Sequence, residues 1–134
     1  MREIKFRIWH EKTNNMFMPY SFNFYGDNNT ISLISYNKIK NIYLELEDRE
    51  EHITVLAEDC ILMQYIGLKD INGKEIYEWD ILSNDCYKCI VEYDVLFCRY
   101  VLNKNGRRFE IISNNTIKDM KIIGNICENL EYKG

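Results

Sequence analysis

Proline and alanine are almost absent from this chain of 134 residues, which has one of each, Pro19 and Ala57. Alanine is the strongest helix former, and the chain instead contains 19 Ile and 10 Tyr, residue types that favour a pleated strand over a helix. No segment shows a sustained helical period, and the best candidate helix, 116–123, has only about two turns. These shortages predict a mostly β protein.

A basic tract and a long apolar run are also missing. The sequence has 17 Lys and Arg against 21 Asp and Glu, a net charge of −4, which disfavours binding to duplex DNA or to an anionic membrane surface. No run approaches the roughly 18–20 apolar residues that span a bilayer, and the N-terminus lacks the apolar stretch of a signal peptide. We therefore expect a cytoplasmic protein.

Motifs for catalysis and metal binding are scarce. The two histidines, His10 and His52, are isolated in expected loops, and the nucleophile-elbow, P-loop and dinucleotide-binding motifs are absent. Cys86 and Cys89 have the spacing of a zinc clip, but no second such pair or paired His supplies the other ligands. We interpret these cysteines as strand thiols, expect no metal and no cofactor, and infer that the protein is not an enzyme.

Short alternations of apolar and polar residues predict strands along the whole chain. The expected strands are 3–9, 16–25, 30–36, 41–47, 53–57, 60–66, 75–82, 88–95, 96–102, 107–113 and 121–127. Pro19 cannot donate to a ladder hydrogen bond, so it predicts a short or edge strand. Asn72 and Gly73 predict a tight turn because both tolerate positive φ. The strand spacing in the C-terminal half suggests a small barrel or roll.

Aromatic residues beside cations are the strongest candidates for a binding surface. Trp9 falls on the polar face of the first expected strand beside Arg7, and Tyr77 and Trp79 share the strand that follows the Asn-Gly turn. Exposed rings near cations can stack on nucleobases or other flat ligands, contributing about 1–3 kcal/mol per stacked base. The alternative, which the pattern favours, is that these rings pack between the halves of the chain or between subunits.

Three stretches of the sequence occur in an order and at a spacing that resemble a known family. They are 1–9 (MREIKFRIW), 62–81 (LMQYIGLKDINGKEIYEWDI) and 122–129 (IIGNICEN). Together they resemble the YopX-like family of phage and prophage proteins. The resemblance implies a mostly β protein whose C-terminal half is an SH3-like barrel, and it implies no general activity.

Two positions depart from the pattern of that family. The family usually has Gly between Glu78 and Asp80, where this chain has Trp79, and usually an Asp after the first Trp, where this chain has His10. Gly allows positive φ or a close backbone approach. Trp79 therefore indicates a change either in the backbone at this turn or in a ligand contact that the family shares.

We expect an N-terminal β region, residues 1–60, packed on an SH3-like small barrel, residues 61–134. The candidate binding residues are Arg7, Trp9, Tyr65, Lys69, Tyr77, Trp79 and Asp80. The functional hypothesis is a non-enzymatic phage or prophage protein of the bacterial host cytoplasm, acting in counter-defence, that binds a host protein or sequesters a nucleotide-type signal in a homo-oligomer. The alternative is a single-stranded nucleic-acid-binding module, which the negative net charge disfavours.

Overall fold

The computed structural model describes residues 2–24, 39–45 and 52–129, and the chain divides into two compact units. One unit is Phe6–Leu62, and the other combines Met1–Lys5 with Met63–Gly134. The units change within strand β6, Cys60–Lys69. The assignment of residues 1–60 and 61–134 as separate domains stays a prediction.

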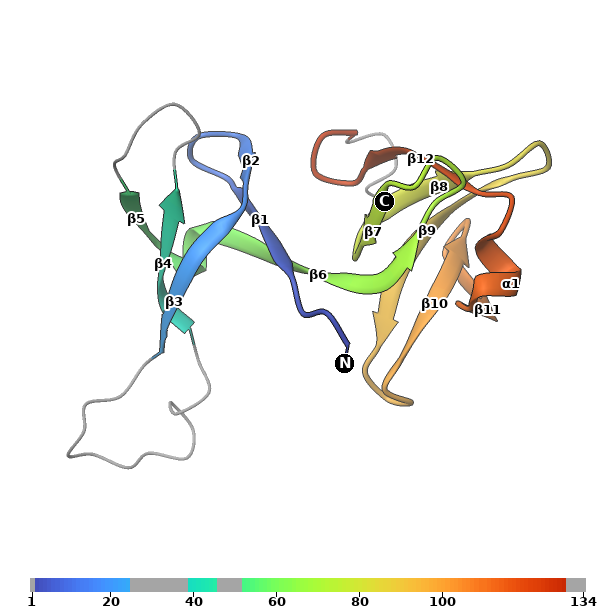
Figure 1. Ribbon diagram of the computed structural model, residues 1–134, viewed down its shortest axis with the longest axis horizontal. Coiled ribbons are helices and arrows are strands. Elements are labelled where there is room, and N and C mark those ends of the chain that lie inside the picture. Colours follow the sequence, from blue (N-terminus) through green and yellow to red (C-terminus); the bar gives the residue numbers. More distant parts are fainter. Residues whose placement is uncertain (1, 25–38, 46–51, 130–134) are drawn as a thin grey trace. The chain divides into compact units, whose positions relative to one another are not determined.

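The unit that begins at Phe6 is built of short antiparallel strands (Figure 1). Its elements are β1 (Phe6–His10), β2 (Asn15–Phe17), β3 (Pro19–Phe24), β4 (Ile39–Glu45), β5 (His52–Leu56), the 3₁₀ helix η1 (Ala57–Asp59) and the start of β6. β3, β4 and β5 form a three-stranded sheet in that order. Pro19 opens β3, which is an edge strand of this sheet, as its missing N–H predicts. The expected strand 30–36 lies outside the described residues.

The other unit contains a five-stranded antiparallel sheet with the order β11-β10-β9-β8-β12. The elements are β7 (Glu75–Tyr77), β8 (Asp80–Ser83), β9 (Lys88–Asp94), β10 (Arg99–Lys104), β11 (Arg107–Ile111), α1 (Asn114–Ile117) and β12 (Lys121–Asn125). Figure 1 shows β8, β9 and β10 as a strongly curved sheet with α1 beside β11. Asn105 and Gly106 both have positive φ, 54° and 82°, which closes the tight turn between β10 and β11.

The core of this unit covers one face of the five-stranded sheet. Leu82 lies opposite Cys89 in the ladder, and Leu102 lies opposite Val91, so all four side chains point to the same face. They are buried together with Ile76, Ile117 and Met120. Burying a large aliphatic side chain contributes roughly 1.5–3 kcal/mol, so this cluster is the main source of stability in the unit.

The structure confirms the prediction of a mostly β protein and corrects the bounds of three expected strands. Residues 75–82 form two strands, β7 and β8, because Trp79 adopts φ +69° between them. The expected strands 88–95 and 96–102 become β9 and β10, which pair antiparallel, but a turn occupies residues 95–98, where Cys98 has φ +53°. The SH3-like barrel stays a prediction. Within the described ranges, no helix is long and apolar enough to cross a bilayer.

Candidate functional site

A groove of about 800 Å³ opens on the five-stranded sheet. Its lining includes Ile81, Ile90, Glu92 and Asn103, from β8, β9 and β10. Ile81 pairs with Ile90, and Asn103 also pairs with Ile90. Because side chains alternate along a strand, these residues point away from the core face that Leu82, Val91 and Leu102 share. The groove therefore combines an aliphatic surface with a carboxylate and an amide.

Trp79 lines the same groove and holds an unusual backbone conformation. It occupies the turn between β7 and β8 with φ +69°, in the left-handed region that bulky residues rarely adopt. Its N–H donates to the carbonyl of Val91 at 2.8 Å, and its carbonyl accepts from the N–H of Ile126 at 3.1 Å. Strand β9 and the turn that follows β12 thus hold the conformation in place. Gly would adopt this backbone easily, whereas in this chain Trp79 adopts it and contributes to the groove lining.

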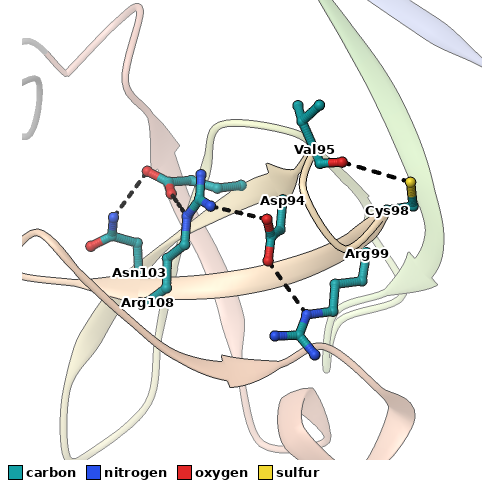
Figure 2. Close-up of polar contacts among 7 residues, drawn as sticks. Asp94, Val95, Cys98, Arg99, Asn103 and Arg108 are labelled. Atoms are coloured by element: carbon teal, nitrogen blue, oxygen red, sulfur yellow. Dashed lines mark hydrogen bonds and ion pairs between the residues drawn. The ribbon is translucent and has the colours of Figure 1, made fainter.

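A network of charged and amide side chains connects β9, β10 and β11 beside the groove. Glu92 accepts a hydrogen bond from Asn103 Nδ2 at 3.0 Å and one from Arg108 Nε at 3.1 Å. Arg108 Nη1 also donates to Asp94 at 3.2 Å, and Arg99 Nε lies 3.5 Å from the other oxygen of Asp94 (Figure 2). These contacts fix the Glu92 carboxylate at one position in the groove.

Two lysines bring positive charge to the groove, and one of them lies against a tyrosine ring. Lys88 and Lys104 are exposed residues of the lining, and the Lys104 ammonium lies 5.1 Å from the ring centre of Tyr87. The Tyr87 ring also packs edge-on against Phe109, with centres 5.5 Å apart. Burial raises the pKa of Tyr87, so its hydroxyl stays protonated at neutral pH. Lys88 and Lys104 are therefore the cations of the lining, while the Glu110 and Asp119 carboxylates lie near enough to Tyr87 to raise its pKa as well.

The two cysteines with zinc-clip spacing both line the groove, but in different environments. Cys86 is exposed, and Cys89 is buried in the core of the unit. Burial raises the pKa of Cys89 to about 12, so this thiol stays protonated and unreactive at neutral pH. Among the residues that the structure describes, no three His, Cys, Asp or Glu side chains gather in a way that could hold a metal ion.

The predicted candidates near the N-terminus have less exposed surface than the alternation in the sequence suggests. Trp9 is only 7% exposed and Arg7 is half-buried, so the expectation of an exposed Trp9 on a polar face is wrong. His10, expected in a loop, ends β1 and is buried, with Nδ1 2.8 Å from the hydroxyl of Thr13. An aromatic side chain excluded from water supports packing more than ligand stacking.

Four other candidates lie around β6 and β7. Tyr65 and Tyr77 pair across these strands with ring centres 5.7 Å apart, and each is about nine-tenths buried or more. The exposure expected for Tyr77 is therefore wrong. Asp80 is 1% exposed and accepts a hydrogen bond from the N–H of Tyr77 at 2.8 Å. Lys69 is exposed at the end of β6. Of the seven candidates, Trp79 is the one that lines the groove.

Comparison with protein families identifies the chain. A family model described as YopX protein matches residues 5–132. The chain belongs to the YopX family. It also resembles the crystal structure of protein EF1440 from Enterococcus faecalis, with a TM-score of 0.63, 22% identity and full coverage of both chains, which supports the same fold. No curated protein matches the chain.

The structure assigns a scaffold role to the polar residues of the YopX motifs in this chain. Asp70, in the turn after β6, accepts hydrogen bonds from the N–H groups of Asn72, Lys74 and Ile122, each at 2.9 Å. Burial alone would raise the pKa of Asp70, but these three donors lower it below its ordinary value. The contact with Ile122 joins the central motif to the C-terminal one.

The C-terminal motif is held in a similar way. The side-chain oxygen of Asn125 accepts from the N–H groups of Cys127 and Glu128 at 3.0 Å, which caps the turn after β12. A Cβ at Gly124 would displace the side chain of Asn129, whose oxygen accepts from the N–H of Asn125 at 3.2 Å. Within the stretches that carry the family resemblance, Asp70 and Asn125 therefore hold turns, whereas Ile81 and Ile126 line the groove.

Proposed function

We propose that this YopX-family chain is a non-enzymatic binding protein that holds a small nucleotide-type ligand in the groove of its five-stranded sheet. The observation that carries the proposal is the groove itself. Its volume of about 800 Å³ lies within the range of small-molecule sites. It combines an aromatic ring, aliphatic residues, a hydrogen-bonding pair and two lysines.

The base and the phosphate of a nucleotide each have matching groups in the groove. Trp79, Ile90 and Ile126 offer the flat, apolar surface that a base requires. Lys88 and Lys104 offer cationic donors for phosphate. The net charge of −4 disfavours general affinity for polyanions, so recognition of an anion depends on this local pair of lysines.

The chemistry of the groove favours binding over catalysis. Glu92 is held on both oxygens by neighbouring side chains, which suits a group that positions a ligand. Cys89 stays protonated because burial raises its pKa to about 12, so it is a poor nucleophile. These features support the non-enzymatic part of the proposal.

Isothermal titration of the full chain with cyclic nucleotides and with ADP-ribose-derived nucleotides tests the proposal. We expect saturable heat with at least one of them, and a weaker affinity in Lys104→Gln. Lys121→Gln is the matched control, because Lys121 is an exposed lysine on β12 outside the groove lining. No heat with any nucleotide would rule out the small-molecule function.

Self-association and the biological setting form the remainder of the proposal. Val95, Leu96 and Phe97, in the turn between β9 and β10, are 76%, 82% and 63% exposed. Three consecutive exposed apolar residues support a homo-oligomer, because exposed apolar patches mark interaction sites. From the family resemblance alone, we also propose a role in counter-defence in the cytoplasm of a phage-infected bacterium, with a host protein as an additional partner.

Native mass spectrometry of the protein purified from its host would reveal the number of subunits and any bound molecules together.

The single-stranded nucleic-acid alternative receives no support from the described residues. It rested on a row of exposed aromatic rings that included Trp9 and Tyr77, and both are buried. A groove of limited volume favours a small ligand over an extended strand.

A further inference from the structure

Glu92 is the one carboxylate among the described residues that line the groove. Its side chain is 15% exposed and comes from the middle of β9. One oxygen accepts from Asn103 Nδ2, and the other accepts from Arg108 Nε. A carboxylate has about four lone-pair sites, so these two hydrogen bonds leave acceptor capacity on both oxygens.

The partners of Glu92 come from the next two strands of the sheet, β10 and β11. Asn103 is on β10 and Arg108 is on β11, and a register shift between Leu102 and Asn103 brings Arg108 opposite Asn103. Arg108 is held in turn by Asp94, which also pairs with Arg99 (Figure 2). Glu92 is therefore fixed by side chains that are themselves fixed, which is the condition for geometric selectivity.

The polar part of the groove presents acceptors more than donors at this position. Asn103 uses its amide nitrogen to donate to Glu92, which sets the orientation of the amide and leaves its oxygen as an acceptor. Arg108 directs its Nε to Glu92 and one terminal nitrogen to Asp94. A ligand that meets Glu92 and Asn103 must therefore supply N–H donors.

We propose that Glu92 selects the base of the ligand, so that the groove prefers a guanine-type base over an adenine-type base. This inference rests on the proposed function. Guanine has a ring N–H beside an exocyclic amino group, two adjacent donors that match the two oxygens of a carboxylate. Adenine has an acceptor nitrogen beside its amino group, and an acceptor facing a carboxylate leaves both groups unsatisfied.

The alternative is a purely structural role, in which Glu92 pairs with Arg108 only to connect β9 and β11. This structural role would affect stability but would not distinguish one base from another. A series of ligands that differ only in donors separates the two roles. GMP has both donors, IMP has the ring N–H without the amino group, and AMP has an acceptor in place of the ring N–H.

The experiment is isothermal titration of the full chain with GMP, IMP and AMP. We expect the affinity to fall in that order, with GMP at least about tenfold tighter than AMP. In Glu92→Gln, one of the two acceptor oxygens becomes a donor, so the preference for GMP over AMP should fall to about twofold or less. Circular dichroism and a cooperative thermal transition verify that the variant is folded.

Asp94→Asn is the matched control. Asp94 is on the same strand and binds the same Arg108, but it does not line the groove, so the preference for GMP should survive. Asp94 is buried, so Glu110→Gln on exposed β11 replaces it if Asp94→Asn fails to fold.

The possible results separate this inference from the function on which it rests. Equal affinity for GMP and AMP, or a GMP preference that persists in Glu92→Gln, would overturn the role of Glu92 and leave nucleotide binding intact. A loss of preference in both Glu92→Gln and the control would also overturn it, because the effect would then be structural. Absence of binding to any nucleotide would overturn the proposed function itself.

Discussion

The two faces of the five-stranded sheet carry alternate residues of the same strands, yet they have different composition and burial. On one face, Val91 and Leu102 are completely buried in the apolar core. On the other, Ile90, Glu92 and Asn103 remain partly exposed and line the groove. A strand with a period of two can therefore stabilise the unit with one set of residues and recognise a ligand with the other.

The largest effect on stability is expected when a side chain on the core face is truncated. Leu102→Ala removes a fully buried side chain and should lower the free energy of unfolding by about 2–5 kcal/mol, because it leaves a cavity. Ile90→Ala, on the groove face of the neighbouring strand, should cost less because Ile90 is half-exposed, and it should weaken ligand binding. Urea denaturation, monitored by near-UV circular dichroism, gives the free energy of unfolding of each variant. Equal losses would contradict the division between the faces.

A smaller loss is expected at the polar anchor between the β6–β7 turn and β12. In Asp70→Asn, the amide cannot accept from three backbone N–H groups as the carboxylate does, so at least one buried donor loses its partner. The expected cost is about 1–3 kcal/mol at neutral pH. Asp85→Asn, at an exposed position, is the control and should have almost no effect.

The Asp70 carboxylate should also make the stability of the fold depend on pH. The pKa of Asp70 is lower in the folded chain than in the unfolded one, where Asp titrates near about 3.9. Its contribution is therefore complete above that value and is lost as the pH falls through the folded pKa. Thermal unfolding measured between neutral pH and pH 3 should show a steeper acid loss for the native chain than for Asp70→Asn. Parallel curves would refute the role of this carboxylate.

Substitutions of Trp79 separate the effect of its backbone conformation on stability from the effect of its indole on ligand binding. Trp79→Gly and Trp79→Ala both remove the indole, but only Gly adopts φ +69° without strain. We expect Trp79→Gly to be more stable than Trp79→Ala by about 1 kcal/mol in thermal or urea unfolding. Both variants should bind nucleotide more weakly than the native chain. An Ala variant as stable as the Gly variant would show that the turn has a different backbone.

The smallest effect on stability is expected at the tip of the β9–β10 turn. Leu96→Ser changes an exposed side chain and should alter the free energy of unfolding by less than about 0.5 kcal/mol. If the tip forms an interface between copies, sedimentation velocity should nonetheless show weaker self-association. Ile71→Ser is the control, because Ile71 is an isolated apolar residue that is 60% exposed. Unchanged assembly in Leu96→Ser would exclude the tip from the interface.

Features that depend on adjacent residues were predictable from the sequence. The scarcity of Ala and the many Ile and Tyr residues correctly predicted a mostly β chain, and Pro19 correctly predicted an edge strand. Gly73 has φ +80°, as expected for the turn after Asn72. Each of these depends on the preference of one or two residues for a backbone conformation, which neighbours in the sequence already determine.

The break at Trp79 shows where local preference fails. Residues 75–82 alternate like one strand, but the hydrogen bonds from Trp79 to Val91 and from Ile126 to Trp79 fix a turn there. The partners are 12 and 47 positions away in the sequence, so no local pattern contains them. A contact formed at long range outweighed a bulky side chain's preference for negative φ.

By itself, the sequence determined the β character of the chain, most of its strands and the Asn-Gly turn, because these follow from the backbone preferences of neighbouring residues. The tertiary structure decided which residues share the groove. Glu92, Asn103 and Arg108 meet through the pairing of β9, β10 and β11 and the register shift after Leu102. Strand register is set by long-range packing and hydrogen bonding, and a shift of one residue would place a different set of side chains together.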